Sequence, residues 1–290
     1  MRSTTRLREL LSRELLNQND LIVAPGVYDG ISARLAEQAG SPVVYMTGAG
    51  VSASLGYPDF GLVTMSEMVE RAAILTRTVS VPVIADADTG YGNELNVTRT
   101  VREFEARGVA AIHIEDQVFP KRCGHLDGKE VISKTEFLSK IKAAVRARQD
   151  PDFVIIARTD ARATHDLDEA IERVNSALAL GADMAFVEAP SSLEEIESIP
   201  LRVNGPCVLN VVQGGRTPLF DMRRIREIGF RMAIVPGASL VPTLLATDAA
   251  MVDLMKTGMV QGLPDGMDVR SVFSRLGSAE WLAMQKDVPR

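Results

Sequence analysis

The sequence predicts a (β/α)8 barrel, because eight short apolar runs alternate with amphipathic stretches from one end of the chain to the other. The runs are rich in β-branched residues and lack in–out alternation, as is typical of parallel strands covered on both faces. They comprise residues 21–24, 42–46, 81–85, 110–114, 153–157, 184–187, 207–210 and 232–235. Eight β/α units that close on themselves make such a barrel.

The stretches between the runs have the periodicity of amphipathic helices. They include residues 31–39, 66–77, 95–106 and 167–180. Gly40, Gly108, Gly181 and Gly229 stand just before the next strand, where glycine permits a left-handed helix cap. A doubly wound open sheet is the alternative, but no Gly-x-Gly-x-x-Gly turn follows the first run. Because no linker interrupts the pattern, we expect a single domain over residues 1–290, with the barrel at about 20–240 and C-terminal helices at about 241–290.

Both ends of the chain add helical segments to the barrel. Residues 1–11 resemble a short amphipathic helix and lack the continuous apolar stretch of a signal peptide. Residues 242–256 and 272–284 are helical stretches with more apolar residues than a peripheral helix needs. We expect them to pack on another subunit, although packing over their own barrel is the alternative. No stretch approaches the roughly 20 uninterrupted apolar residues of a membrane span, so no membrane partner is expected.

The composition is permissive about function. Of the 290 residues, 46% are hydrophobic and 24% charged, and the formal net charge is −6. Basic residues are scattered rather than clustered, which argues against a nucleic-acid surface. The two cysteines, Cys123 and Cys207, are too few for a disulfide framework, so a reduced cytoplasm is expected.

Polar side chains follow five successive predicted strands. In a barrel the active site lies at the carboxyl ends of the strands, so these side chains are expected to converge on one mouth. They are Asp86 and Asp88 after the third strand, Glu115 after the fourth, Arg158 after the fifth, Glu188 after the sixth and Asn210 after the seventh. Arg158 offers paired donors that match a substrate carboxylate, although it could also pair with Glu188 or Asp160.

The predicted mouth favours a hard metal ion. Asp86, Asp88 and Glu115 are oxygen donors, a set that favours Mg²⁺, or Mn²⁺ as a substitute, held by one or two direct carboxylates and by waters. An isolated Asp-x-Asp could equally be a loop cap. The segment 45–50, Tyr-Met-Thr-Gly-Ala-Gly, offers backbone N–H groups and a hydroxyl that could hold a carboxylate or an enolate oxygen.

A long connection after the fourth strand carries Lys121-Arg122-Cys123-Gly124-His125. A loop of this size with its own glycines is typical of an active-site lid. We expect the neighbouring cations to lower the pKa of Cys123 by favouring its thiolate. Such a thiol can donate or accept a proton or attack as a nucleophile, whereas the plainer alternative is a solvated basic loop.

With these segments in place, the chain resembles the isocitrate lyase/phosphoenolpyruvate mutase superfamily, and most closely its short members related to methylisocitrate lyase and 2,3-dimethylmalate lyase. The resemblance runs from about residue 20 to 240. Its segments, in chain order, are residues 45–50, 55–61, 86–92, 114–117, 121–125, 156–160 and 214–218. Lys-Arg-Cys-Gly-His is the most specific of them.

The resemblance implies a (β/α)8 barrel whose last helix is exchanged between subunits, usually in a homotetramer, and a Mg²⁺-dependent reaction on a small carboxylic acid. For the metal, it implies that Asp86 is a direct ligand and that Asp88 and Glu115 are carboxylates that hold the waters of the metal. For the substrate, it implies that Thr47, Gly48 and Ala49 bind the oxo-acid portion, that Asp59 is a gating residue, and that further contacts come from Arg158, Glu188, Asn210 and Gly124. For catalysis, it implies that Cys123 is the acid, with Lys121 and His125 in the same loop and Tyr45 as a candidate base.

The implied chemistry is a retro-aldol cleavage of a substituted 2-hydroxy dicarboxylate or tricarboxylate to a 2-oxo acid and a carboxylate. Ala49 replaces a glycine of methylisocitrate lyases, Val241 stands near an expected arginine, and Gln213 replaces an acidic residue. These departures favour a smaller dicarboxylate of the 2,3-dimethylmalate type. Carboxyphosphonoenolpyruvate mutase, oxaloacetate hydrolase or decarboxylase activity, and a non-catalytic metabolite-binding protein are the alternatives.

Overall fold

The computed structural model describes residues 1–12, 21–219 and 221–286. Their contacts divide the chain into two units, Met1–Leu240 and Val241–Arg290, and each is described by itself.

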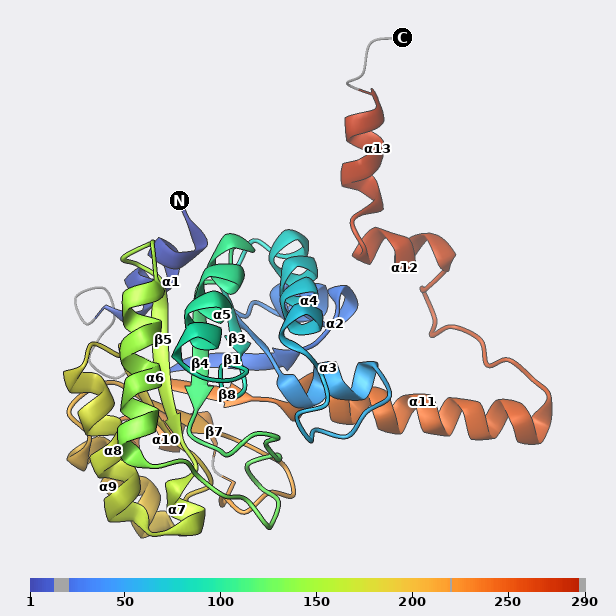
Figure 1. Ribbon diagram of the computed structural model, residues 1–290. Helices are drawn as coiled ribbons and strands as arrows, with labels where there is room; N and C mark the ends of the chain where they lie inside the picture. Colours follow the sequence, from blue (N-terminus) through green and yellow to red (C-terminus); the bar gives the residue numbers. More distant parts are fainter. Residues whose placement is uncertain (13–20, 220, 287–290) are drawn as a thin grey trace. The chain divides into compact units, whose positions relative to one another are not determined.

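Eight parallel strands form a closed barrel in the order β1 to β8, which confirms the predicted fold class (Figure 1). The strands are β1 (Ile22–Val27), β2 (Val44–Met46), β3 (Val83–Asp86), β4 (Ala111–Glu115), β5 (Val154–Thr159), β6 (Met184–Val187), β7 (Cys207–Asn210) and β8 (Met232–Val235). The last three match the predicted ranges, and the first five begin one or two residues later. Several extend further into the mouth, so that Asp86 and Glu115 belong to strands rather than to loops.

Helices connect the strands around the barrel (Figure 1). They are α2 (Gly30–Gln38), α3 (Gly48–Ser54), α4 (Met65–Thr78), α5 (Glu94–Ala106), α6 (Lys134–Ala147), α7 (Ala161–Thr164), α8 (Leu167–Ala179), α9 (Leu193–Arg202) and α10 (Met222–Ile228), and α1 (Ser3–Leu11) precedes the first strand. Side chains such as Asp29 and Thr64 begin them by accepting hydrogen bonds from free backbone N–H groups. The four predicted glycine caps all have positive φ, between 79° and 107°.

The core forms one layer inside the barrel and others between the strands and the helices. The inner cluster takes buried side chains from all eight strands, among them Ile84, Ile156, Phe186 and Ile234. Leu7 of α1 belongs to the same cluster and is fully buried. The N-terminal helix therefore closes the end of the barrel opposite the mouth, which leaves the carboxyl ends of the strands as the open end.

The C-terminal segment consists of α11 (Gly237–Thr257), α12 (Val269–Arg275) and α13 (Ser278–Lys286). The single helix predicted near 272–284 is wrong: Gly277, with φ of 89°, separates two helices. The expectation that no segment could span a membrane also needs correction. By length and composition alone α11 could do so, with a mean hydropathy of 1.3 over 18 residues that are not buried. Such a helix is equally suited to burial against protein.

Candidate active site

The mouth of the barrel brings together the side chains predicted from the strand ends. Arg158, on β5, is the centre of the group. Its Nε lies 3.1 Å from Glu115 Oε2 and 3.1 Å from Asp160 Oδ2, and its Nη2 lies 3.9 Å from Glu188 Oε1. The guanidinium also stacks 5.1 Å from the Phe186 ring centre. Arg158 therefore faces three buried carboxylates, including Glu115, a pairing that the sequence did not indicate.

Glu188 is held as an anion beside the Cys123 loop, the segment that contains residues 121–131. Asn210 Nδ2 donates to its two carboxylate oxygens at 3.1 and 3.2 Å, and His125 Nε2 lies 3.2 Å from Oε1. Burial opposes ionisation, but Arg158 and the hydrogen bond from His125 outweigh it and lower the pKa of Glu188 to about 2.

His125 joins two segments that are distant in sequence. Its Nδ1 accepts a hydrogen bond from the backbone N–H of Arg216 at 3.0 Å, so the proton of the neutral ring lies on Nε2 and points to Glu188. Gly215 packs so closely that a Cβ there would lie 2.6 Å from His125 Nδ1. His125 therefore connects the Cys123 loop to residues 215 and 216, which follow β7.

Asp86 and Asp88 lie side by side at the end of β3. Asp86 accepts hydrogen bonds from the N–H groups of Asp88 at 2.9 Å and Gly48 at 3.3 Å. Burial opposes its ionisation, yet His113, Lys121 and Arg158 together hold the pKa of Asp86 below its ordinary value. Asp88 has the opposite shift, because burial raises its pKa to about 6.

The carboxylates of the mouth are spread too widely to enclose a bare ion. Among the residues that the structure describes, no three His, Cys, Asp or Glu side chains are grouped as metal ligands. Mg²⁺ commonly uses one or two carboxylates and keeps its waters, and such an arrangement fits this donor set. Glu115 is fully buried, and its Oε1 has no partner within the described residues, as expected of an oxygen that faces bound water.

Lys121 connects three parts of the mouth. Its Nζ lies 2.6 Å from Asp59 Oδ1 and 2.7 Å from Asp88 Oδ1, and the side chain is buried. The carbonyl of Asp59 also accepts a hydrogen bond from the N–H of Cys123 at 3.2 Å. Asp59 therefore contacts this loop at two points, the Lys121 ammonium and the backbone of Cys123.

The predicted lowering of the pKa of Cys123 is wrong. Burial raises the pKa of this thiol, and the hydrogen bond to the backbone of His125 offsets only part of the effect. Two neighbouring cationic or polar residues are engaged elsewhere, since Lys121 pairs with Asp59 and Asp88 while His125 bonds to Glu188. Cys123 is therefore a protonated thiol at neutral pH, which suits a proton donor better than a nucleophile.

Tyr45 does not have the properties of a resting general base. Burial raises its pKa well above the ordinary value, so its hydroxyl keeps its proton. The hydroxyl lies 2.9 Å from Nε2 of His113 and 3.5 Å from Asp86 Oδ2. His113 was not predicted as a site residue. Burial lowers its pKa to about 4, so it is neutral at pH 7, and only its place on β4 two residues before Glu115 could have indicated it.

Close backbone approaches explain two of the predicted glycines. A Cβ on Gly48, at the start of α3, would lie 2.5 Å from Asp86 Oδ2, and one on Gly124 would lie 2.7 Å from Arg158 Nη2. Thr47 caps α3 by accepting from the N–H of Gly50 at 3.3 Å. The structure therefore places Thr47, Gly48 and Gly124 at the mouth, with Ala49 between the first pair and Gly50.

A second polar network beneath the mouth was missed in the sequence. Asp116 accepts hydrogen bonds from Thr159 Oγ1 at 2.6 Å and from the N–H of Asp160 at 2.8 Å, and it pairs with Arg173 at 3.0 Å. All of these groups are buried. The network fixes the end of β5, from which Arg158 projects. Asp116 follows Glu115 directly, but its partner Arg173 lies on α8 and gave no local signal.

These features define a barrel with a buried cluster of Arg158 and three carboxylates at its mouth, and with a thiol-bearing loop beside that cluster. The Phosphoenolpyruvate phosphomutase family matches residues 12–255 of the chain. The chain therefore belongs to the phosphoenolpyruvate mutase/isocitrate lyase superfamily of enzymes.

Similar proteins include several lyases. A 2,3-dimethylmalate lyase of Eubacterium barkeri is 47% identical, covering 92% of this chain and 93% of its own length. A 2-methylisocitrate lyase of Aeropyrum pernix is 44% identical, covering 91% of this chain and 85% of its own.

Solved structures agree with this placement. An oxaloacetate acetylhydrolase in complex with 3,3-difluorooxalacetate superposes with a TM-score of 0.93 at 39% identity, covering 98% of this chain and 96% of that one. A 2,3-dimethylmalate lyase gives 0.92 at 42%, covering 98% and 94%. A phosphonopyruvate hydrolase complex with oxalate and Mg²⁺ gives 0.86 at 29%, covering 99% of both chains.

Proposed function

We propose that the protein is a Mg²⁺-dependent carbon–carbon lyase that cleaves a substituted 2-hydroxy dicarboxylate of the 2,3-dimethylmalate type. The observation that carries the proposal is the position of the Cys123 loop, whose Gly124 lies against Arg158 and Glu188 while Cys123 keeps a thiol proton. Similarity to the 2,3-dimethylmalate lyase and the absence of an arginine at Val241 favour the dicarboxylate over a tricarboxylate such as 2-methylisocitrate.

The metal would be held by Asp86 directly, with Asp88 and Glu115 accepting hydrogen bonds from its waters. The similar hydrolase crystallised with oxalate and Mg²⁺ supports the choice of metal. Bound there, Mg²⁺ supplies positive charge that favours an ionised 2-hydroxyl and stabilises the 2-oxo product. Mn²⁺, which takes similar oxygen ligands, is expected to substitute for it.

The residues of this chain then perform the rest of the reaction. Arg158 binds the far carboxylate of the substrate through its remaining donors, and Asn210 and Glu188 hold Arg158 and His125 in place. The hydroxyl proton passes through a bound water to Glu115, whose buried carboxyl has a raised pKa and can accept it. The C2–C3 bond then breaks, so that its electron pair passes to C3 and C2 becomes the carbonyl carbon of the oxo acid. Cys123 transfers its thiol proton to C3, which completes the carboxylate product. Tyr45 donates a hydrogen bond at the mouth, where the oxo-acid portion lies next to Thr47, Gly48 and Ala49.

A panel assay tests the proposal directly. Release of pyruvate or glyoxylate would be measured with Mg²⁺ across substituted malates and isocitrates, and release of oxalate and acetate would be measured with oxaloacetate. We expect 2,3-dimethylmalate to react fastest. Oxaloacetate has a place because the similar hydrolase structure makes that activity the second candidate. Cleavage of oxaloacetate alone would establish the hydrolase, and cleavage of no panel member would favour a phosphonomutase.

The acid role of Cys123 has its own test. Cys123→Ala is expected to lower turnover by roughly 10²- to 10⁴-fold, the usual contribution of a positioned general acid. Binding of oxalate should persist, because the thiol is not needed to hold a carboxylate. Cys207→Ala is the matched control, since Cys207 is the other free cysteine and is buried in the wall of the barrel. Unchanged turnover in Cys123→Ala would refute the assignment.

We also propose that the C-terminal helices pack on a second subunit within a homotetramer. Within the described chain α11 has no buried residue, and Leu244, Leu245, Met251 and Val252 are each more than half exposed. Apolar surface on this scale is typical of an interface. Light scattering should give a tetramer, and a chain ending at residue 240 should lose that assembly.

A further inference from the structure

Lys129 lies at the far end of the catalytic loop and has no role in the proposal above. Its side chain is 3% exposed, and its Nζ lies 2.8 Å from Asp160 Oδ1. The same ammonium donates a hydrogen bond to the carbonyl oxygen of Gly124, the residue after Cys123. Lys129 thus joins the backbone beside the thiol to a buried carboxylate at the end of β5.

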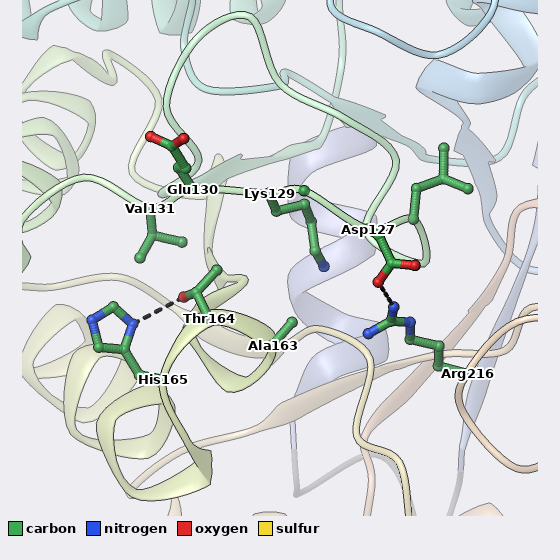
Figure 2. Close-up of a pocket in the computed structure, with 10 residues that line it drawn as sticks. Asp127, Lys129, Glu130, Val131, Ala163, Thr164, His165 and Arg216 are labelled. Carbon is green, nitrogen blue, oxygen red and sulfur yellow. Dashed lines mark hydrogen bonds and ion pairs between the residues drawn. The ribbon is translucent and has the colours of Figure 1, made fainter.

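The outer side of the loop, residues 126–131, borders a pocket. A pocket of about 410 Å³ separates residues 126–131 from residues 163–165 of α7 and its end. Figure 2 shows this pocket, with the Asp127–Arg216 ion pair at one side and the Lys129 side chain directed inward. Asp127 is 94% exposed, and such a surface pair contributes little to stability. Lys129 therefore makes the buried polar contact of this part of the loop.

The base of the loop is fixed independently of Lys129. The N–H of Val118 donates to the carbonyl of Glu130 at 2.8 Å, and Gln117 forms an antiparallel bridge with Val131. These backbone contacts close the loop at its ends. Nearer Cys123, the N–H of that residue donates to the carbonyl of Asp59 at 3.2 Å, and His125 contacts Glu188. Lys129 adds a buried ion pair on the other side of Gly124.

Asp160 links Lys129 to the cluster formed by Arg158, Glu115 and Glu188. It accepts the Lys129 ammonium at one oxygen and Arg158 Nε at the other. Without Lys129, Arg158 would be the cation that offsets the charge of Asp160, and less of its positive charge would act on a substrate carboxylate. With the loop closed, the second cation offsets the charge of Asp160 and leaves Arg158 more of its field for the substrate.

We propose that Lys129 is a positioning residue that latches the Cys123 loop closed and, by neutralising Asp160, lets Arg158 bind the carboxylate of the substrate. The effect on substrate binding rests on the proposed function, whereas the latch does not. Closure of the Cys123 loop and binding of the substrate carboxylate are then coupled through the Lys129 side chain, because the closed loop places its positive charge beside Asp160.

The test uses the full chain with Lys129→Met, Lys129→Gln and Lys129→Arg. The control is Lys134→Met, which removes a positive charge from the start of α6, where Lys134 pairs with the exposed Glu172. Alkylation of Cys123 by N-ethylmaleimide would be followed by mass spectrometry without substrate, with the buried Cys207 peptide as internal reference. The Met and Gln variants are expected to react roughly tenfold faster or more, because the loop loses its buried ion pair with Asp160 and exposes Cys123 more often. Arg, which keeps the charge, and the Lys134 control should stay close to the parent protein.

Kinetics provide the second measurement. On the cleaved substrate the Met and Gln variants should raise KM by roughly tenfold or more, and Arg should recover most of the loss. Unchanged alkylation of Cys123 in folded Met and Gln variants would overturn the latch. If neither variant folds, Lys129 determines barrel stability instead and the proposal is overturned. Faster alkylation without any lyase activity in the parent protein would keep the latch and reject the proposed function.

Discussion

Replacement of Gly124 by alanine should prevent closure of the catalytic loop while leaving the barrel intact. A Cβ at this position would lie 2.6 Å from Glu188 Cγ and 2.7 Å from Arg158 Nη2, closer than real Cβ contacts. Both partners are buried and are held by Asn210, Glu115 and Asp160, so neither moves aside easily. The backbone of Gly124 is outside the left-handed region, so the contact is the only penalty.

The size of the effect follows from packing energetics. Adding a methyl group to a filled site costs about 1–3 kcal/mol. The loop can avoid this cost by staying open, so the closed population should fall about 5- to 150-fold, and kcat/KM with it. The melting temperature should hardly change, because the open loop keeps the core unaltered.

Steady-state kinetics and thermal melting would be measured together on Gly124→Ala and on Gly30→Ala. Gly30 is a suitable control because the nearest atom to its added Cβ would be Thr78 Oγ1 at 3.5 Å, an ordinary contact. The reasoning fails if Gly124→Ala retains kcat/KM within about threefold of the parent, since 0.6 kcal/mol is below the range expected for overpacking. It also fails if the melting temperature falls in proportion to the activity.

Three further predictions concern pH, metal and stability. Burial raises the pKa of Cys123 above the ordinary 9.0, so the thiol keeps its proton at neutral pH and loses it only as the pH rises through the raised value. A kcat that is limited by this acid should therefore fall only at alkaline pH. A fall centred near pH 7 that Cys123→Ser shifts would contradict this prediction. Treatment with EDTA should abolish turnover, and Mg²⁺ or Mn²⁺ should restore it, whereas full activity in EDTA would reject the metal assignment. Arg173→Met should lower the free energy of unfolding in urea by about 3–5 kcal/mol, because it leaves the buried Asp116 without its cation. The control Arg202→Met breaks an exposed ion pair and should lower it by under about 1 kcal/mol. Equal effects of the two variants would show that burial of the pair does not matter.

The barrel was predictable because its signals are local. Each strand is a short apolar run, and four of the runs follow a helix that ends at a glycine with positive φ, as at Gly181 and Gly229. A residue at the carboxyl end of a parallel strand in a barrel faces the mouth whatever the other strands contain. For this reason Asp86, Glu115 and Arg158 could be assigned to one site before any contact was known. Strand ends were less certain by one or two residues, because hydrogen bonding between neighbours decides where pairing stops.

The charge states of the site could not be predicted in this way. Cys123 has Lys121, Arg122 and His125 beside it in sequence, yet burial determines its pKa. Lys121 pairs with Asp59, 62 positions away, and His125 bonds to Glu188 and to the backbone of Arg216. Lys121 and His125 therefore interact with side chains that are distant in sequence and that only the fold brings near.

The sequence by itself therefore determined the class of fold, the side of the barrel that carries the chemistry, and the thiol-bearing loop. Those properties follow from residue type, strand period and chain order, which need no knowledge of distant contacts. The tertiary structure decided which groups are paired, which are neutral and how the loop is held, as Lys129 and Asp160 illustrate. Electrostatic interactions depend on separation and burial in space, and the chain reveals neither until it has folded.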